Sequence, residues 1–229
     1  MKLNTFIVLI LCSFHTSLWA QKNASIKLNF NGLMKNLPLI LDSNYVLTNN
    51  DTISIETCRF YISNILLVNN NQTVFKDSTI AHLVDLAADQ SLAINLFYPE
   101  DLKFDLVQFN LGIDSSLNVA EVLSGDLDPT KGMYWTWQSG YINFKIEGKS
   151  KKSPSRYKQF QYHLGGYLYP NNTLQTFSFI TNKKSEFNFN IEIDKFLEGI
   201  DLSTMYQIMS PSSSSVLLSK KLAQLFNVE

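Results

Sequence analysis

Few side chains in this sequence could bind a soft metal ion. It contains three histidines, two cysteines and five methionines. His82 (in HLVD) and His163 (in YHLGG) lie in strand-like segments, where successive side chains alternate between faces. Cu(I) accepts imidazole nitrogen and thioether sulfur, so Met133, Met205 and Met209 are candidates to complete a low-coordinate site with the histidines. The alternative is that the methionines are core residues and that each histidine is hydrogen-bonded within the fold.

Other arrangements of reactive residues are incomplete. His82 and Asp85 are three residues apart, which places them on opposite faces of a strand, so they cannot form the imidazole–carboxylate pair of a nucleophilic triad. Asp114, Asp126 and Asp128 carry the oxygen ligands that Ca²⁺ accepts, although an ordinary turn at Asp128 is the simpler interpretation. We therefore expect a protein that is not an enzyme.

The first twenty residues predict a secretory signal peptide. Lys2 is a short positive region, residues 6–11 (FIVLIL) are apolar, and cleavage is expected after Ala20. Removal of residues 1–20 leaves Cys58 as the single cysteine, and we interpret it as a buried small apolar side chain, with a reactive thiol as the alternative. We expect an exported protein, periplasmic or secreted to the cell surface, with no transmembrane segment.

The charge balance argues against nucleic-acid binding. The chain has 19 basic and 20 acidic residues, whereas nucleic-acid phosphates need a basic surface. The one concentrated basic run is 149–156 (KSKKSPSR). No aromatic residue is interleaved with its charges, so we interpret it as a solvated loop.

Alternation of apolar and polar residues dominates the chain and predicts the elements that position these side chains. In residues 25–30 (SIKLNF) the apolar side chains share one face, which is the pattern of a half-buried strand. Clusters of Asn, Asp, Gly and Lys separate such segments and predict turns. Similar strands are expected at 59–68, 80–86, 104–113, 141–146, 159–168, 174–180 and 187–193.

About nine or ten short strands with little helix between them predict an all-β protein, an antiparallel β-sandwich. The one convincing helix is C-terminal, over 215–226, with a shorter helical turn near 194–199. No long linker divides the chain, so residues 21–229 are expected to form a single domain.

The segment 125–148 (GDLDPTKGMYWTWQSGYINFKIEG) has the most distinctive sequence. Met133, Trp135 and Trp137 share one side of a strand, and Ser139-Gly140 interrupts the alternation as a bulge would. Two tryptophans on one face predict core packing, because each buries a large area. An exposed platform for ligands is the alternative.

This segment resembles the signature of the MbnP-like family of bacterial exported proteins. Further similarities follow in order along the chain, at 59–65 (RFYISNI), 82–85 (HLVD), 111–115 (LGIDS), 162–167 (YHLGGY) and 209–211 (MSP). They extend over roughly residues 25–226, and the Asn- and Lys-rich composition is similar to that of Bacteroidetes-type members.

The resemblance implies a β-sandwich that binds copper outside the cytoplasm. In characterised relatives, copper lies among histidines and a tryptophan that a di-haem, peroxidase-like partner protein has oxidised to kynurenine. By analogy, His82 and His163 are the expected copper ligands, and such a partner is expected here.

A recognition module is the competing hypothesis. Trp135, Trp137, Tyr134 and Tyr141 could stack on a ligand such as a glycan at the surface. Burial of these aromatic side chains would argue against it.

Overall fold

Alternating apolar residues give the first strand, β1 (Asn23–Met34), one buried face and one open face. Ile26, Leu28 and Phe30 are fully buried, whereas the polar residues between them are partly exposed. The computed structural model describes residues 22–119, 124–136, 139–182 and 184–228, and the same pattern recurs in its other long strands. The predicted signal peptide and Trp137 lie outside these residues.

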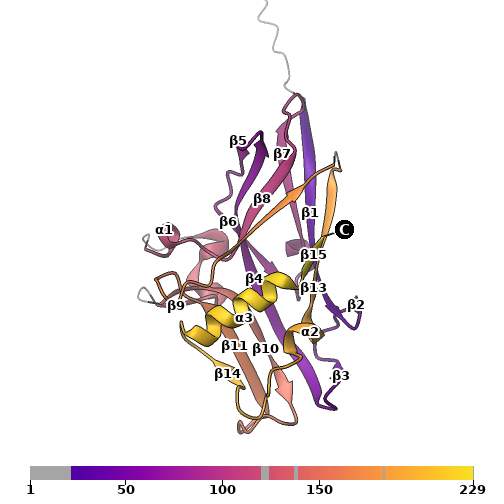
Figure 1. Cartoon of the computed structure of the whole chain (residues 1–229), viewed down its shortest axis with the longest axis vertical. Coiled ribbons are helices and arrows are strands. Elements are labelled where there is room, and N and C mark those ends of the chain that lie inside the picture. The colour runs from indigo at the N-terminus through magenta and orange to yellow at the C-terminus, as the bar shows by residue number, and fades with distance from the viewer. Residues whose placement is uncertain (1–21, 120–123, 137–138, 183, 229) are drawn as a thin grey trace, which may run out of the picture.

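The larger sheet is built around β4 (Thr52–Asn69), which crosses the molecule diagonally (Figure 1). Strands pair along both of its edges, so β4 is a central strand of the sheet. One edge carries β8 (Leu106–Leu111) and β10 (Gly140–Ser150), and the other carries β3 (Asn44–Val46), β5 (Gln72–Lys76) and β6 (Ala81–Asp85). The sheet continues through β12 (Gln175–Ile180) beyond β8, and through β11 (Gln159–Gly165) and β14 (Gln207–Ile208) beyond β10; β9 (Tyr134–Thr136) pairs with the start of β10.

The smaller sheet forms the second layer. Its order is β15 (Phe226–Val228), β13 (Glu186–Glu192), β1 and β2 (Leu37–Pro38), and β7 (Ala93–Pro99) also pairs with β1. Most strand pairs are antiparallel, but β1–β13 and β11–β14 are parallel. The predicted all-β sandwich with a short C-terminal helix is confirmed.

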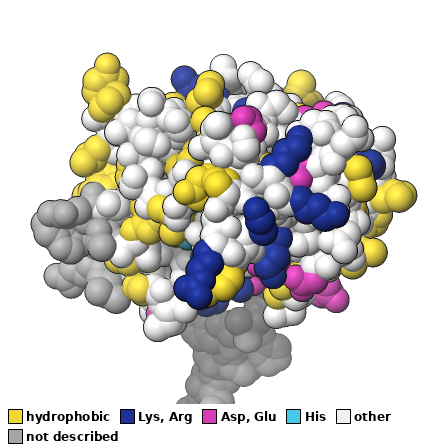
Figure 2. All heavy atoms as spheres, turned by 90° about the horizontal axis from the view of Figure 1, so that it is seen from below, with side chains coloured by type: hydrophobic (Ala, Val, Ile, Leu, Met, Phe, Trp, Pro, Cys, Tyr) yellow, Lys and Arg dark blue, Asp and Glu magenta, His cyan; other side chains and the backbone are white. Residues whose placement is uncertain are grey.

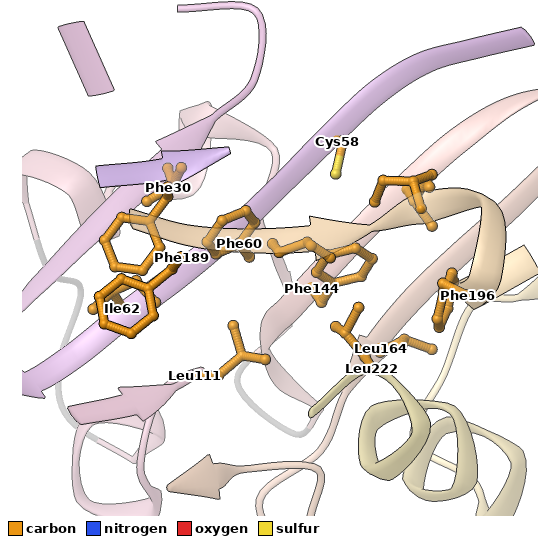
Figure 3. Packing of buried hydrophobic residues seen from close by; sticks show 14 of the residues in the cluster. Phe30, Cys58, Phe60, Ile62, Leu111, Phe144, Leu164, Phe189, Phe196 and Leu222 are labelled. Atoms are coloured by element: carbon orange, nitrogen blue, oxygen red, sulfur yellow. The ribbon is translucent and has the colours of Figure 1, made fainter. Parts of the chain in front are cut away.

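Aromatic rings fill the space between the two sheets (Figure 3). Phe30 of the smaller sheet stacks on Phe189, with ring centroids 5.2 Å apart, and meets Phe60 of β4 edge to face at 5.9 Å. Phe60 in turn stacks on Phe144 of β10 at 6.0 Å. Each such ring buries a large apolar area, and together they fix the two sheets against each other.

A second, smaller core lies on the opposite face of the larger sheet. The segment after β8 covers this face with three short helices, α1 (Ser115–Asn118), η2 (Gly125–Leu127) and η3 (Pro129–Lys131). Tyr61, Met133 and Tyr141 are buried beneath them. The distinctive segment 125–148 therefore folds as the cover of this second core and the strand that follows it.

The remaining helices flank the sandwich. They are η1 (Asp89–Ser91), α2 (Ile193–Leu197) and α3 (Ser213–Gln224). Ser212 caps α3 by accepting a hydrogen bond from the Ser215 N–H, and Leu218 and Leu222 are its buried side chains. The helix ends two residues before its predicted end because Phe226 enters β15 and pairs with Ile191. Among the helices that the structure describes, none combines the length and the apolar character needed to cross a membrane.

Candidate metal site at His163

His163 lies in β11, and its position follows from a row of cross-strand neighbours. Arg59 of β4 is opposite both Asp85 of β6 and Lys145 of β10, and Lys145 is opposite His163. Directly opposed side chains point to the same face of a sheet, so these four residues share the face that lies away from the main core. His163 is only 6% exposed.

Glu147 holds the His163 ring. The distance from His163 Nε2 to Glu147 Oε1 is 2.7 Å, and the Gln161 amide donates a second hydrogen bond to the same oxygen at 3.3 Å. The hydrogen bond with His163 is the main cause that lowers the pKa of Glu147; burial opposes it, and the nearby Lys145 ammonium adds to it. Glu147 is therefore a carboxylate, which accepts a hydrogen bond from a protonated Nε2. Sequence patterns do not single it out, because its contact with His163 depends on the register of β10 and β11.

The other ring nitrogen of His163 lacks a partner. Nδ1 is buried and makes no hydrogen bond with any of the described residues. When Nε2 carries the proton shared with Glu147, Nδ1 bears a free lone pair. A histidine oriented by a carboxylate on one nitrogen and open on the other is the usual form of a metal ligand.

Trp135 packs beside this histidine. The two ring centroids are 6.5 Å apart with 30° between the planes, and Trp135 Nε1 is also buried without a partner among the described residues. A Cβ at Gly165 would come within 2.6 Å of the Tyr141 carbonyl oxygen in β10 and within 2.9 Å of Trp135 Cζ3. The small residue beside His163 therefore makes room for the tryptophan ring.

Met209 directly follows β14, the short strand that pairs with β11. β14 runs parallel to β11, with Gln161 aligned with Gln207 and Tyr162 with Ile208. β14 ends at Ile208, so the pairing stops one position before His163 and Met209. Met209 is 41% exposed, and with Met205 it lines a surface pocket of about 440 Å³. The Met209 thioether therefore belongs to a surface pocket at the end of β14, one position beyond the paired residues of β11 and β14.

The other candidate methionines are placed differently. Met133 is fully buried in the second core and contacts no solvent. Met205 is 37% exposed in the loop before β14, and its carbonyl accepts a hydrogen bond from the Tyr162 hydroxyl. Met205 shares the pocket of Met209, whereas Met133 is in the position of a core residue.

The structure does not bring His82 and His163 together. Asp85 shares the face of His163, and His82, three residues away on β6, has its side chain on the other face. Two strands, β4 and β10, also separate β6 from β11, which corresponds to about 14 Å at the usual strand spacing. Across the described residues, no group of three or more His, Cys, Asp or Glu side chains is arranged to hold a metal ion.

His82 belongs to a separate, polar pocket. Its Nε2 lies 2.6 Å from Asp77 Oδ2, and it lines a cavity of about 600 Å³. Two ion pairs line the same cavity, Arg59–Asp85 at 2.8 Å and Lys131–Asp126 at 2.7 Å. The charged groups of this cavity pair with one another, which fits a structural role for His82.

The acidic residues considered as Ca²⁺ ligands instead accept hydrogen bonds from backbone N–H groups or from a lysine. Asp114 accepts a hydrogen bond from the Leu117 N–H, and Asp128 accepts one from the Thr130 N–H. Asp126 binds Lys131 and the Leu83 N–H. These contacts account for the three carboxylates without a metal ion.

Three aromatic residues of the 125–148 segment, Tyr134, Trp135 and Tyr141, pack in the second core. Tyr141 is buried and donates a hydrogen bond from its hydroxyl to the Leu127 carbonyl. Tyr134 packs on Tyr141 with a centroid distance of 4.9 Å, and Trp135 is half-buried. An exposed stacking platform is not formed by these three side chains.

Cys58 is buried in the main core. Burial, with a smaller effect of Asp85, raises the pKa of the Cys58 thiol well above its ordinary value. A thiol in this environment stays protonated and unreactive.

Comparisons with known proteins agree with the fold. The sequence model of the MbnP family matches residues 23–210. Among solved structures, MbnP from Methylosinus trichosporium superposes with a TM-score of 0.63, over 86% of this chain and 88% of that chain, at 12% sequence identity. No match was found among curated proteins. Because the family match spans most of the sequence, the chain belongs to the MbnP family.

Proposed function

We propose that the protein is an exported copper-binding protein and that His163 is its principal metal ligand. The observation that carries the proposal is the buried Nδ1 of His163, which has no partner among the described residues while Glu147 engages Nε2. A buried nitrogen left without a hydrogen bond is costly, and a bound metal ion would relieve that cost. Membership of the MbnP family supports the choice of a metal-related role.

The residues around His163 fit Cu(I) better than harder ions. Met209 directly follows the strand that pairs with β11 and would supply a thioether to His163, and soft sulfur together with imidazole nitrogen favours Cu(I) at low coordination number. Glu147 would orient the imidazole and raise its basicity rather than bind the metal. Copper bound here would supply a redox-active ion at the edge of the larger sheet.

The cellular setting of this proposal rests on the sequence. The segment 1–20 has the features of a signal peptide, which supports export to the periplasm or the cell surface. By resemblance to the family, the partner would be a di-haem, peroxidase-like protein. The chain itself would act as a metal-binding protein and not as an enzyme.

The two histidines provide a matched experiment. The mature chain, residues 21–229, is loaded with Cu(I) without oxygen, desalted and analysed for copper, and its intact mass is recorded. We expect one copper per chain in the wild type and in His82→Ala, and loss of copper in His163→Ala. Copper retained by His163→Ala, or lost only in His82→Ala, would overturn the assignment to His163.

A further inference from the structure

The hairpin that joins β10 to β11 carries a concentrated positive charge. Its cations are Lys149, Lys151, Lys152, Arg156 and Lys158, and no acidic residue occurs between Gly148 and Ser185. The hairpin tip forms one end of the long axis of the molecule, opposite the end where β1 begins (Figure 1). Viewed from that end, Lys and Arg side chains gather on one side of the surface (Figure 2).

Most of this charge is not neutralised within the fold. Lys149 pairs with Glu56, but Lys152 and Lys158 donate to neutral carbonyls, those of Asn49 and Ser153, each at 3.1 Å. Lys151 and Arg156 are exposed. The acidic group near Lys152 is Asp201, which accepts hydrogen bonds from Ser203 and Thr204. The tip therefore keeps a positive charge in a protein whose overall charge is −1.

An aromatic side chain accompanies the cations. Tyr157 is 62% exposed, and the Arg156 guanidinium lies 5.3 Å from the centroid of its ring. The basic run 149–156 contains no aromatic residue, and for this reason the sequence favours a solvated loop. Tyr157 follows that run directly, so the tip presents a ring and a guanidinium together.

Hydrogen bonds hold the tip in one conformation. The hydroxyls of Ser153 and Ser155 both donate to the Gln159 carbonyl, at 2.6 and 3.0 Å. Ser150 donates to the buried Asp51 carboxylate at 2.5 Å. A tip that is already ordered loses little further entropy when it binds.

From these features we propose that the tip of the 149–158 hairpin docks the protein onto a membrane surface of anionic phospholipid. Lys and Arg next to an anionic bilayer gain electrostatic free energy, and Tyr is favoured at the level of the headgroups. A projecting tip at the end of a molecule can meet a flat surface with all of these side chains at once. A single-stranded polyanion is bound instead in a groove that follows its backbone. This surface is independent of the copper site proposed at His163.

The test uses the mature chain and sedimentation with large vesicles of phosphatidylcholine alone or with about one third phosphatidylglycerol, at low salt. The test variant combines Lys151→Gln, Lys152→Gln and Arg156→Gln. The control variant combines Lys76→Gln, Lys103→Gln and Lys184→Gln, which are exposed and lie outside the hairpin. Both variants change the net charge by the same amount, and circular dichroism checks that each is folded.

We expect the wild type and the control variant to bind the anionic vesicles and not the neutral ones. The test variant should bind at least about tenfold more weakly, and Tyr157→Ser should weaken the binding that remains at high salt. The proposal is overturned if the wild type does not bind anionic vesicles or if both triple variants lose binding equally. It is also overturned if the hairpin cations bind a soluble polyanion such as polyphosphate but no vesicle.

Discussion

Glu147 and His163 face each other diagonally across β10 and β11 and are joined through Oε1 and Nε2 at 2.7 Å. When Nε2 of the neutral imidazole carries the hydrogen that Glu147 accepts, Nδ1 keeps a free lone pair. Glu147→Gln keeps a hydrogen-bonding group of the same size but removes the charge that makes the imidazole more basic. We expect its affinity for Cu(I) to fall by about tenfold, since outer partners of ligating histidines contribute on this scale. Competition with a colorimetric Cu(I) chelator measures the change.

Glu56→Gln is the control for Glu147→Gln. Glu56 is also a strand carboxylate paired with a lysine, but it lies beside Lys149 at the hairpin and not beside His163. Its Cu(I) affinity should equal that of the wild type. An equal loss in both variants would mean that overall charge, and not the contact with His163, controls binding.

The thioether of Met209 is the second part of the proposed site. Met209→Leu removes the sulfur and keeps a similar apolar volume at a partly exposed position. We expect about tenfold weaker Cu(I) binding from the loss of a soft ligand, with an unchanged thermal unfolding midpoint. Met133→Leu alters a fully buried methionine instead, and should cost less than about 1.5 kcal/mol of stability without affecting copper. The reverse pattern would place the metal in the second core.

Local sequence patterns predict much of this fold. Period-two alternation identifies β1, β4 and β13 because one face of each strand is buried, and the serine run before Val216 marks the start of α3. The same patterns cannot show that β1 pairs in parallel with β13, since that contact joins segments more than 150 residues apart and depends on how the two sheets assemble.

The sequence predicts which residue types could bind a metal ion, but not which of those residues the fold brings together. An imidazole at His163 is visible in the sequence, but Glu147 becomes its neighbour through the register of β10 and β11, and the segment that carries Met209 is brought to β11 by the pairing of β14. The same register separates His82 from His163, because β4 and β10 lie between their strands. Trp135 reaches the vicinity of His163 from a different strand, where Gly165 has no side chain to exclude it.

Asn118 ties the cover of the second core to β10. Its buried amide donates to the carbonyls of Ile113 and Asp114, and its Oδ1 accepts from the Tyr141 N–H at 2.7 Å. Asn118→Ala would leave these backbone groups unsatisfied, so we expect a loss of about 1–3 kcal/mol in the free energy of unfolding. Urea titration measures it. Asn95→Ala, at an exposed position of β7, should change stability by less than about 0.5 kcal/mol.

Asp126 should make stability depend on pH. Burial alone would raise the pKa of its carboxyl, but hydrogen bonds from Lys131 and Leu83, with the positive charges of Lys131 and His82, lower it below its ordinary value of 3.8. A carboxyl with a lowered pKa in the folded state stabilises the protein above its unfolded pKa, and that contribution is lost as the pH falls through the folded pKa. Asp126→Asn should therefore be less stable than the wild type at pH 7, and the difference should shrink below about pH 4. Urea titrations across pH 2.5–7 measure this, with the exposed Asp101→Asn as the control. If the difference in stability between Asp126→Asn and the wild type stays constant over this range, Asp126 stabilises the fold through the shape of its side chain and not through its charge.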